Sequence, residues 1–106
     1  MGQRKIGFID KLRKFKKTVS MEYDIQNMIL FGSRAKNNNS KYSDFDIIII
    51  SNKFKGINRL DRPYGLYLKW NINRPVDFLC YTPEEFNKLK KQITIVREAV
   101  KEGIEI

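Results

Sequence analysis

The chain alternates polar segments with apolar ones, and the spacing of the apolar positions changes along its length. Near the start, Phe8, Leu12, Phe15 and Val19 recur at intervals of three and four residues. This spacing places them on one face of a helix and leaves the lysines and arginines between them on the other face. The segment therefore predicts an amphipathic helix, whose basic face is either solvated or in contact with nucleic acid.

Three short apolar runs predict β-strands. The first, Asn27–Phe31, is followed by a glycine, which fits a buried strand that ends in a sharp turn. The second, Phe45 and then Ile47–Ile50, is apolar on both faces of the pleat, as a central strand requires. The third, Val76–Tyr81, is also apolar on both faces, apart from one acid at Asp77.

Two further segments have helical patterns. Ile57–Trp70 places its apolar residues at loosely helical spacing. A better-marked helix begins after Thr82, because threonine caps a helix, Pro83 suits the first helical position and Glu85 can reach back to the capping amide. Gly103 is a natural end. The apolar stripe that follows the cap lies on one helix, or on two with a break near Gln92, and consists of Phe86, Leu89, Ile93, Val96 and Val100.

Length and composition indicate one folded domain spanning residues 1–106. The chain has 42% apolar and 31% charged residues, which is ordinary for a globular protein. Its longest apolar stretch is far shorter than the roughly 20 residues that cross a bilayer, and the N-terminus lacks the apolar region of a signal peptide. We therefore expect a cytoplasmic protein that makes no contact with a membrane.

The absence of histidine narrows the chemistry available to the chain. With no histidine and one cysteine, Cys80, the sequence excludes Ser-His-Asp triads, disulfides within the chain and cysteine-built zinc sites. Any catalysis must use carboxylates, lysine, tyrosine or hard cations. The net charge of +9 can attract nucleic acid, an acidic protein or a polyphosphate substrate.

An Asp-x-Asp pair stands at the start of the predicted central strand. Residues two apart on a strand point the same way, so Asp44 and Asp46 face one spot, where Mg²⁺ or Mn²⁺ would relieve their repulsion. The alternative is that Asp44 caps a turn and Asp46 accepts hydrogen bonds from backbone amides. Asp77 favours the metal site, since an unpaired buried carboxylate is costly. If the third strand lies beside the second, three acids meet.

Gly32 and Ser33 supply groups that can bind an anion. A glycine permits close backbone approach, and amides at the start of a helical turn bind phosphate, with the serine hydroxyl as a further donor. Alternatively, Ser33 is only a helix cap. Arg34 either pairs with a phosphate or braces the carboxylates.

Together these residues resemble a known family. A Gly-Ser turn, here Gly32 and Ser33, followed by Asp44 and Asp46 is similar to the motif of the minimal nucleotidyltransferase (MNT) branch of the polymerase-β-like nucleotidyltransferase superfamily. The order of elements matches over almost the whole chain, including the single acid of the third strand. The resemblance implies an α/β (α+β) fold in which a small mixed sheet is flanked by helices. One departure is Asn37, where many members have glycine.

The resemblance also implies a function. Asp44, Asp46 and Asp77 would ligate two Mg²⁺ ions, while Gly32 and Ser33 would hold the β- and γ-phosphates of a nucleoside triphosphate, preferably ATP. Members of this kind are often antitoxins that bind a HEPN-type ribonuclease toxin or transfer AMP to one of its tyrosines. Two alternatives stay open: an antitoxin that acts by binding alone, with catalysis weak or lost, and a basic nucleic-acid-binding module.

Overall fold

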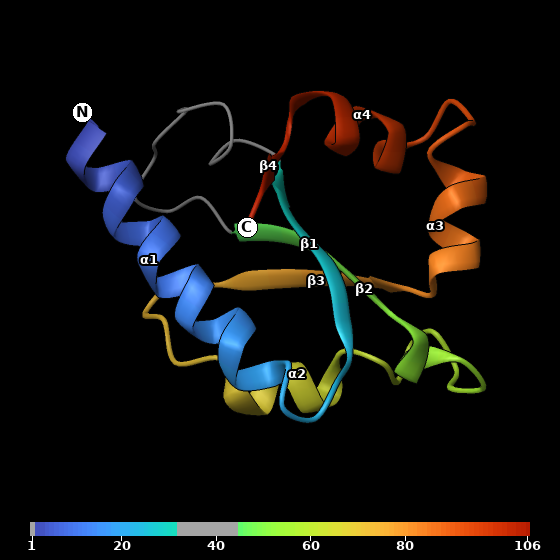
Figure 1. Cartoon of the computed structure of the whole chain (residues 1–106), viewed down its shortest axis with the longest axis horizontal. Helices are drawn as coiled ribbons and strands as arrows, with labels where there is room; N and C mark the ends of the chain where they lie inside the picture. Colours follow the sequence, from blue (N-terminus) through green and yellow to red (C-terminus); the bar gives the residue numbers. More distant parts are fainter. Residues whose placement is uncertain (1, 32–44) are drawn as a thin grey trace.

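The computed structural model describes residues 2–31 and 45–106, with side chains from residue 8 onward. Within these ranges, helices lie on both sides of a four-stranded sheet (Figure 1). The elements are α1 (Gly2–Val19), β1 (Ile25–Phe31), β2 (Phe45–Ser51), the short 3₁₀ helix η1 (Asn52–Phe54), α2 (Tyr64–Lys69), β3 (Val76–Tyr81), α3 (Pro83–Leu89), α4 (Ile95–Glu102) and β4 (Ile104–Glu105).

The sheet is mixed, with the strand order β3-β2-β1-β4. Strand β1 runs antiparallel to both β2 and β4, whereas β2 and β3 are parallel. A mixed sheet flanked by helices is the expected fold class, which is thereby confirmed. Strand β2 is central, as its apolar pattern predicts, and Ile47 to Ile50 are all buried.

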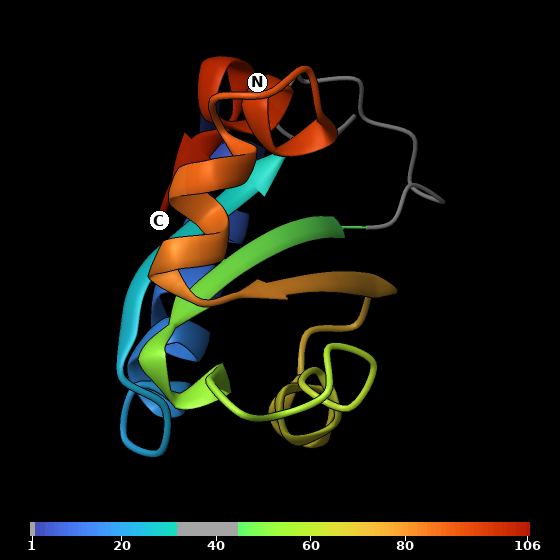
Figure 2. The same cartoon turned by 90° about the vertical axis from the view of Figure 1, so that its right-hand side faces the viewer.

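Two apolar clusters cover the two faces of the sheet. On one face α1 and α2 pack over Phe45, Ile47 and Ile49; on the other, α3 and α4 pack over Ile48 and Ile50 (Figures 1 and 2). The predicted stripe of α1 faces the sheet, and its buried members are Leu12, Phe15 and Val19. None of the described helices combines the length and apolar character needed to span a bilayer.

The segment from residue 57 to 70 departs from its predicted helix. Only Tyr64–Lys69 is helical, because the preceding residues form turns in which the Asn58 side chain accepts a hydrogen bond from the Leu60 amide. Leu60 and Leu68 are more than four-fifths exposed, so the apolar pattern here does not mark a core. The sequence did not predict β4 and η1, because both are too short to produce a recognisable hydrophobic period.

The C-terminal part forms two helices, the second of the two arrangements considered. Thr82 and Glu85 make the predicted capping box at the start of α3, with Pro83 in the first position. Thr94 caps α4, since its hydroxyl accepts a hydrogen bond from the Arg97 amide. Ile93 lies in the break between the helices and is 94% exposed, so its place in the apolar stripe was wrong.

Gly103 ends α4 as predicted, but for a different reason. Its φ is −78°, which any residue can adopt. A Cβ at this position would lie 2.7 Å from Cγ2 of Ile29 and 2.8 Å from the carbonyl oxygen of Leu30, and nearer still to the carbonyl of Ala99. Glycine is therefore needed because the chain passes against β1, where β4 joins the sheet.

Replacing Gly103 with alanine should therefore destabilise the protein. The added methyl group forces backbone apart at the α4–β1 contact, an overpacking cost of about 1–3 kcal/mol. The denaturation midpoint in urea measures it. Lys101→Ala, an exposed change in the same helix, is the control and should leave the midpoint nearly unchanged. Equal midpoints for Gly103→Ala and the wild type would contradict the close approach.

Candidate active site

The start of β2 and the start of β3 bring two of the predicted acids together. In the parallel pairing of these strands, Asp46 and Asp77 are direct partners. Across the antiparallel pairing with β1, Asp46 also stands opposite Phe31, the last residue of that strand. Adjacent strands lie about 4.8 Å apart, so the two backbones hold these acids as neighbours. Three segments distant in the sequence thus meet at one end of the sheet.

The two carboxylates also share a face of the sheet. Ile48 and Ile50 of β2, and Leu79 and Tyr81 of β3, belong to the cluster beneath α3 and α4. Because side chains alternate along a strand, positions 46 and 77 are on this same face. Like charges placed side by side repel, and a cation between them removes that cost.

Exposure differs between the two acids. Asp46 is partly buried, whereas Asp77 is exposed. The argument that Asp77 is a costly buried carboxylate was therefore wrong, because β3 is an edge strand and Asp77 is its second residue. The exposure of Asp77 leaves one side of the pair open to solvent, so a hydrated ion or a phosphate can approach it.

The remaining predicted site residues, Gly32, Ser33, Arg34 and Asp44, lie outside the described residues, and their roles stay predictions. In the sequence, Gly32 directly follows the end of β1 and Asp44 directly precedes the start of β2. Those two strand ends are the ones that meet at Asp46. In the sequence, the Gly-Ser and Asp-x-Asp motifs therefore directly adjoin the two strand ends that lie beside the acid pair.

The donor set at this end fits a hard divalent cation. Both described groups are carboxylates, the ligands that Mg²⁺ and Mn²⁺ accept, and no thiol or imidazole accompanies them. Within residues 8–31 and 45–106, no cluster of three or more acids, cysteines or histidines is found. The third ligand of the predicted set, Asp44, falls in the part of the chain that the structure does not describe.

Two other side chains bear on the chemistry. Burial raises the pKa of the Cys80 thiol to about 12, with only a partial opposing effect from the Arg62 guanidinium, so this cysteine is not a nucleophile near neutral pH. Arg74 precedes β3, and its backbone carbonyl accepts a 2.8 Å hydrogen bond from the Trp70 indole. Its buried Nε has no hydrogen-bond partner within the described structure. The sequence did not single out Arg74, which has no motif around it.

Comparison with known proteins agrees with this geometry. The profile of the nucleotidyltransferase domain matches residues 12–102, which is most of the chain. The chain belongs to the nucleotidyltransferase domain family. The matched range includes both strands that carry the acid pair as well as the Gly-Ser and Asp-x-Asp motifs.

A solved structure shows the same fold as this nucleotidyltransferase domain. It is the crystal structure of a candidate nucleotidyltransferase from Sulfolobus solfataricus, with a TM-score of 0.65 and 23% sequence identity. The match covers 81% of the present chain and 77% of the other. At this identity the likeness extends to the fold alone. No functionally curated protein matches the chain.

Proposed function

We propose that this nucleotidyltransferase domain transfers a nucleoside monophosphate, preferably AMP from ATP, to an acceptor hydroxyl in a reaction that depends on Mg²⁺. The observation that carries the proposal is the in-register pair of Asp46 and Asp77 on one face of the sheet, in a chain of this family. Two facing carboxylates on adjacent strands form a site that a divalent cation can occupy.

Each residue of the site has a proposed role. Asp44, Asp46 and Asp77 would hold divalent ions, which would lower the pKa of the acceptor hydroxyl and neutralise charge on the triphosphate. Gly32 and Ser33 would donate hydrogen bonds to the β- and γ-phosphates. Arg34 is the proposed counter-charge to the leaving group, and Arg74, at the head of β3, is a second candidate for that role.

The proposed transfer forms one bond and breaks another at the α-phosphorus of ATP. The acceptor oxygen bonds to the α-phosphorus, the bond from that phosphorus to the bridging oxygen breaks, and pyrophosphate leaves. Asp77 is the proposed recipient of the acceptor proton, because it is the exposed member of the pair and stands on the edge strand, where an acceptor from solution has access.

The acceptor is proposed to be a tyrosine hydroxyl on a partner protein, a HEPN-type toxin, which would make the chain an antitoxin. Support for this partner comes from the resemblance to minimal nucleotidyltransferases. A partner that is bound but never modified would indicate the other antitoxin mechanism, inhibition by binding.

Mass spectrometry of co-purified proteins tests the proposal. The chain is isolated with any protein encoded beside it and incubated with ATP and Mg²⁺, with EDTA in a parallel sample. The expected result is a gain of one or more AMP units on the partner, with label transferred from α-labelled but not γ-labelled ATP, and no gain in EDTA. Transfer of the γ-phosphate, or an unmodified partner, would overturn it.

A further inference from the structure

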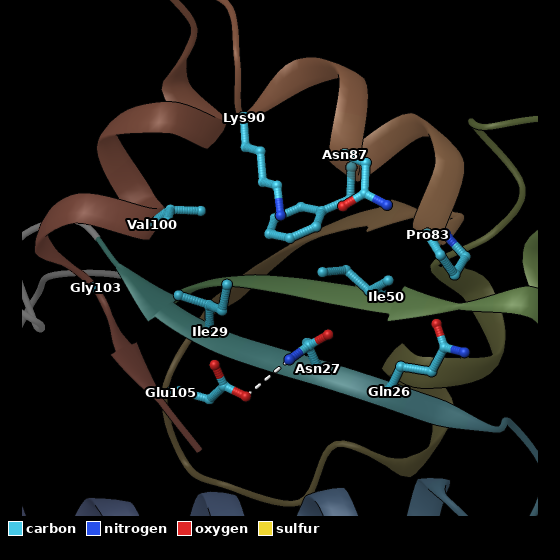
Figure 3. Close-up of a pocket in the computed structure, with 11 residues that line it drawn as sticks. Gln26, Asn27, Ile29, Ile50, Pro83, Asn87, Lys90, Val100, Gly103 and Glu105 are labelled. Carbon is cyan, nitrogen blue, oxygen red and sulfur yellow. Dashed lines mark hydrogen bonds between the residues drawn. The ribbon is translucent and has the colours of Figure 1, made fainter.

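Helices α3 and α4 frame a pocket over β1 that is separate from the acid pair (Figure 3). Its volume is about 390 Å³. The side chains of Ile29 and Ile50 form an apolar floor, and each is less than a tenth exposed. Residues of α3 line one side, and the end of α4 with β4 lines the other. A preformed hollow of this size is within the range that holds small ligands, roughly 300–1,000 Å³.

Packing divides this pocket from the acids on the same face of the sheet. Along β2, Ile48 lies between Asp46 and Ile50, which lines the pocket, and Ile48 is buried in the cluster beneath α3 and α4. On β1, Ile29 is the lining residue nearest the acids, and it is two residues from Phe31, the partner of Asp46, or about 7 Å at the usual rise per residue. The pocket and the acid pair are therefore different positions on one face of the sheet.

Three primary amides surround the apolar floor. They belong to Gln26 and Asn27 of β1 and to Asn87 of α3 (Figure 3). Nδ2 of Asn27 donates a 2.8 Å hydrogen bond to Oε2 of Glu105, which fixes the orientation of this amide. Each amide offers both donors and an acceptor. A ligand that matches them needs donors and acceptors side by side along its edge.

Phe86 and Lys90 supply the other two features of the pocket. Phe86 packs against the cluster beneath α3, so its ring is anchored. The ammonium of Lys90 lies 5.4 Å from the centre of that ring, and the lysine is exposed. A cation–π contact at an exposed site is worth only about 0.5–1 kcal/mol, so the ammonium can leave the ring for an anion at little cost.

We propose that this pocket binds a purine nucleotide, specifically the base and phosphate of an adenosine monophosphate-type ligand. A flat base suits the apolar floor and the Phe86 ring, whereas a sugar would place hydroxyls against Ile29 and Ile50. Paired donors and acceptors on adenine match asparagine and glutamine amides. Lys90 provides the counter-charge for the phosphate. The site does not depend on the proposed transfer reaction.

Binding in EDTA tests the inference, because chelation removes any metal-dependent attachment at the acids. AMP is titrated into the full chain by calorimetry or ligand-observed NMR, with adenosine and ribose 5-phosphate as partial ligands. AMP should bind, adenosine should bind about tenfold more weakly for loss of one charged contact, and ribose 5-phosphate should not bind detectably. Failure of AMP to bind at millimolar concentration would overturn the proposal.

Substitutions in and outside the pocket show whether AMP binds there. Asn87→Leu keeps the size of the side chain but removes its amide, and it should weaken AMP binding at least about tenfold. Lys90→Met should remove the preference for AMP over adenosine, while Lys91→Met, outside the pocket, should preserve it. The triple change of Asp44, Asp46 and Asp77 to asparagine should bind AMP in EDTA as the wild type does. Loss of binding in the triple variant, or unchanged binding by Asn87→Leu, would place the nucleotide elsewhere.

Discussion

Changing Asp44, Asp46 and Asp77 together to asparagine should abolish Mg²⁺-dependent transfer of label from α-labelled ATP. Asparagine keeps the shape of each side chain but removes the charge that would hold a divalent ion in the proposed site. Losing one preorganised electrostatic contact at a reacting phosphate commonly costs about 100-fold or more in rate, and this variant loses the whole set. Label transfer per unit of enzyme, measured with and without EDTA, gives the result.

The fold of this variant should be intact, which keeps the experiment interpretable. Asp77 is exposed, and removal of neighbouring like charges relieves repulsion at the end of the sheet. The thermal midpoint should therefore stay close to that of the wild type. Asp24→Asn, an exposed acid at the opposite end of β1, is the matched control and should retain full transfer. Full activity in the triple variant would contradict the assignment of the acids.

The strands that carry the site could be predicted from local patterns. Phe45 and Ile47–Ile50 read as a central strand because both pleat faces are apolar, and a strand with its acid at position 77 followed from the same rule. The pairing of Asp46 with Asp77 needed the structure. Strand register depends on how distant segments align, and no pattern within either strand contains that information.

The wrong predictions concern residues whose exposure depends on tertiary packing. Asp77 was expected to be buried because its neighbours are apolar, but it is exposed because β3 lies at the sheet edge. Leu60 and Leu68 fit a helical stripe in the sequence, yet both face solvent. The nucleotide pocket proposed above is lined by residues from five elements, so no local sequence motif could predict it.

The same limit applies to Arg62, which no sequence motif singles out. Its side chain is only 7% exposed, and it donates hydrogen bonds to the backbone carbonyls of Ile57 and Cys80. Two further bonds, of 2.6 and 3.2 Å, reach the two carboxylate oxygens of Glu85. Through these bonds Arg62 connects the segment after β2 to the N-terminal cap of α3 and to β3, the strand that carries Asp77.

Replacing Arg62 with methionine should destabilise the protein by about 1.5–3 kcal/mol, the usual range for hydrogen bonds to a charged group, because Arg62 is buried while Glu85 is 30% exposed and keeps part of its hydration. Denaturant midpoints measure this cost. Arg59→Met is a close control, because Arg59 approaches the same carboxylate at 3.8 Å but is 60% exposed. A screened surface pair contributes at most about 1 kcal/mol. Equal losses of stability in Arg62→Met and Arg59→Met would show that the burial of Arg62 does not determine the size of the effect.

The pair also predicts a particular response to acid. Hydrogen bonding to Arg62 is the main reason that the pKa of Glu85 falls from 4.5 to about 2. Because the folded-state pKa is the lower one, the stabilisation is fully present above the unfolded-state pKa of 4.5 and is lost as the pH falls through about 2, below which both states bind the proton. In Arg62→Met most of this pH dependence should disappear, leaving the smaller part that comes from the Thr82 amide and Arg59, whereas Arg59→Met should retain most of it. Unfolding free energies of the wild type and both variants, measured between pH 2 and pH 6, test this difference between the variants. An unchanged slope of the unfolding free energy against pH in Arg62→Met would mean that another partner lowers the pKa of Glu85.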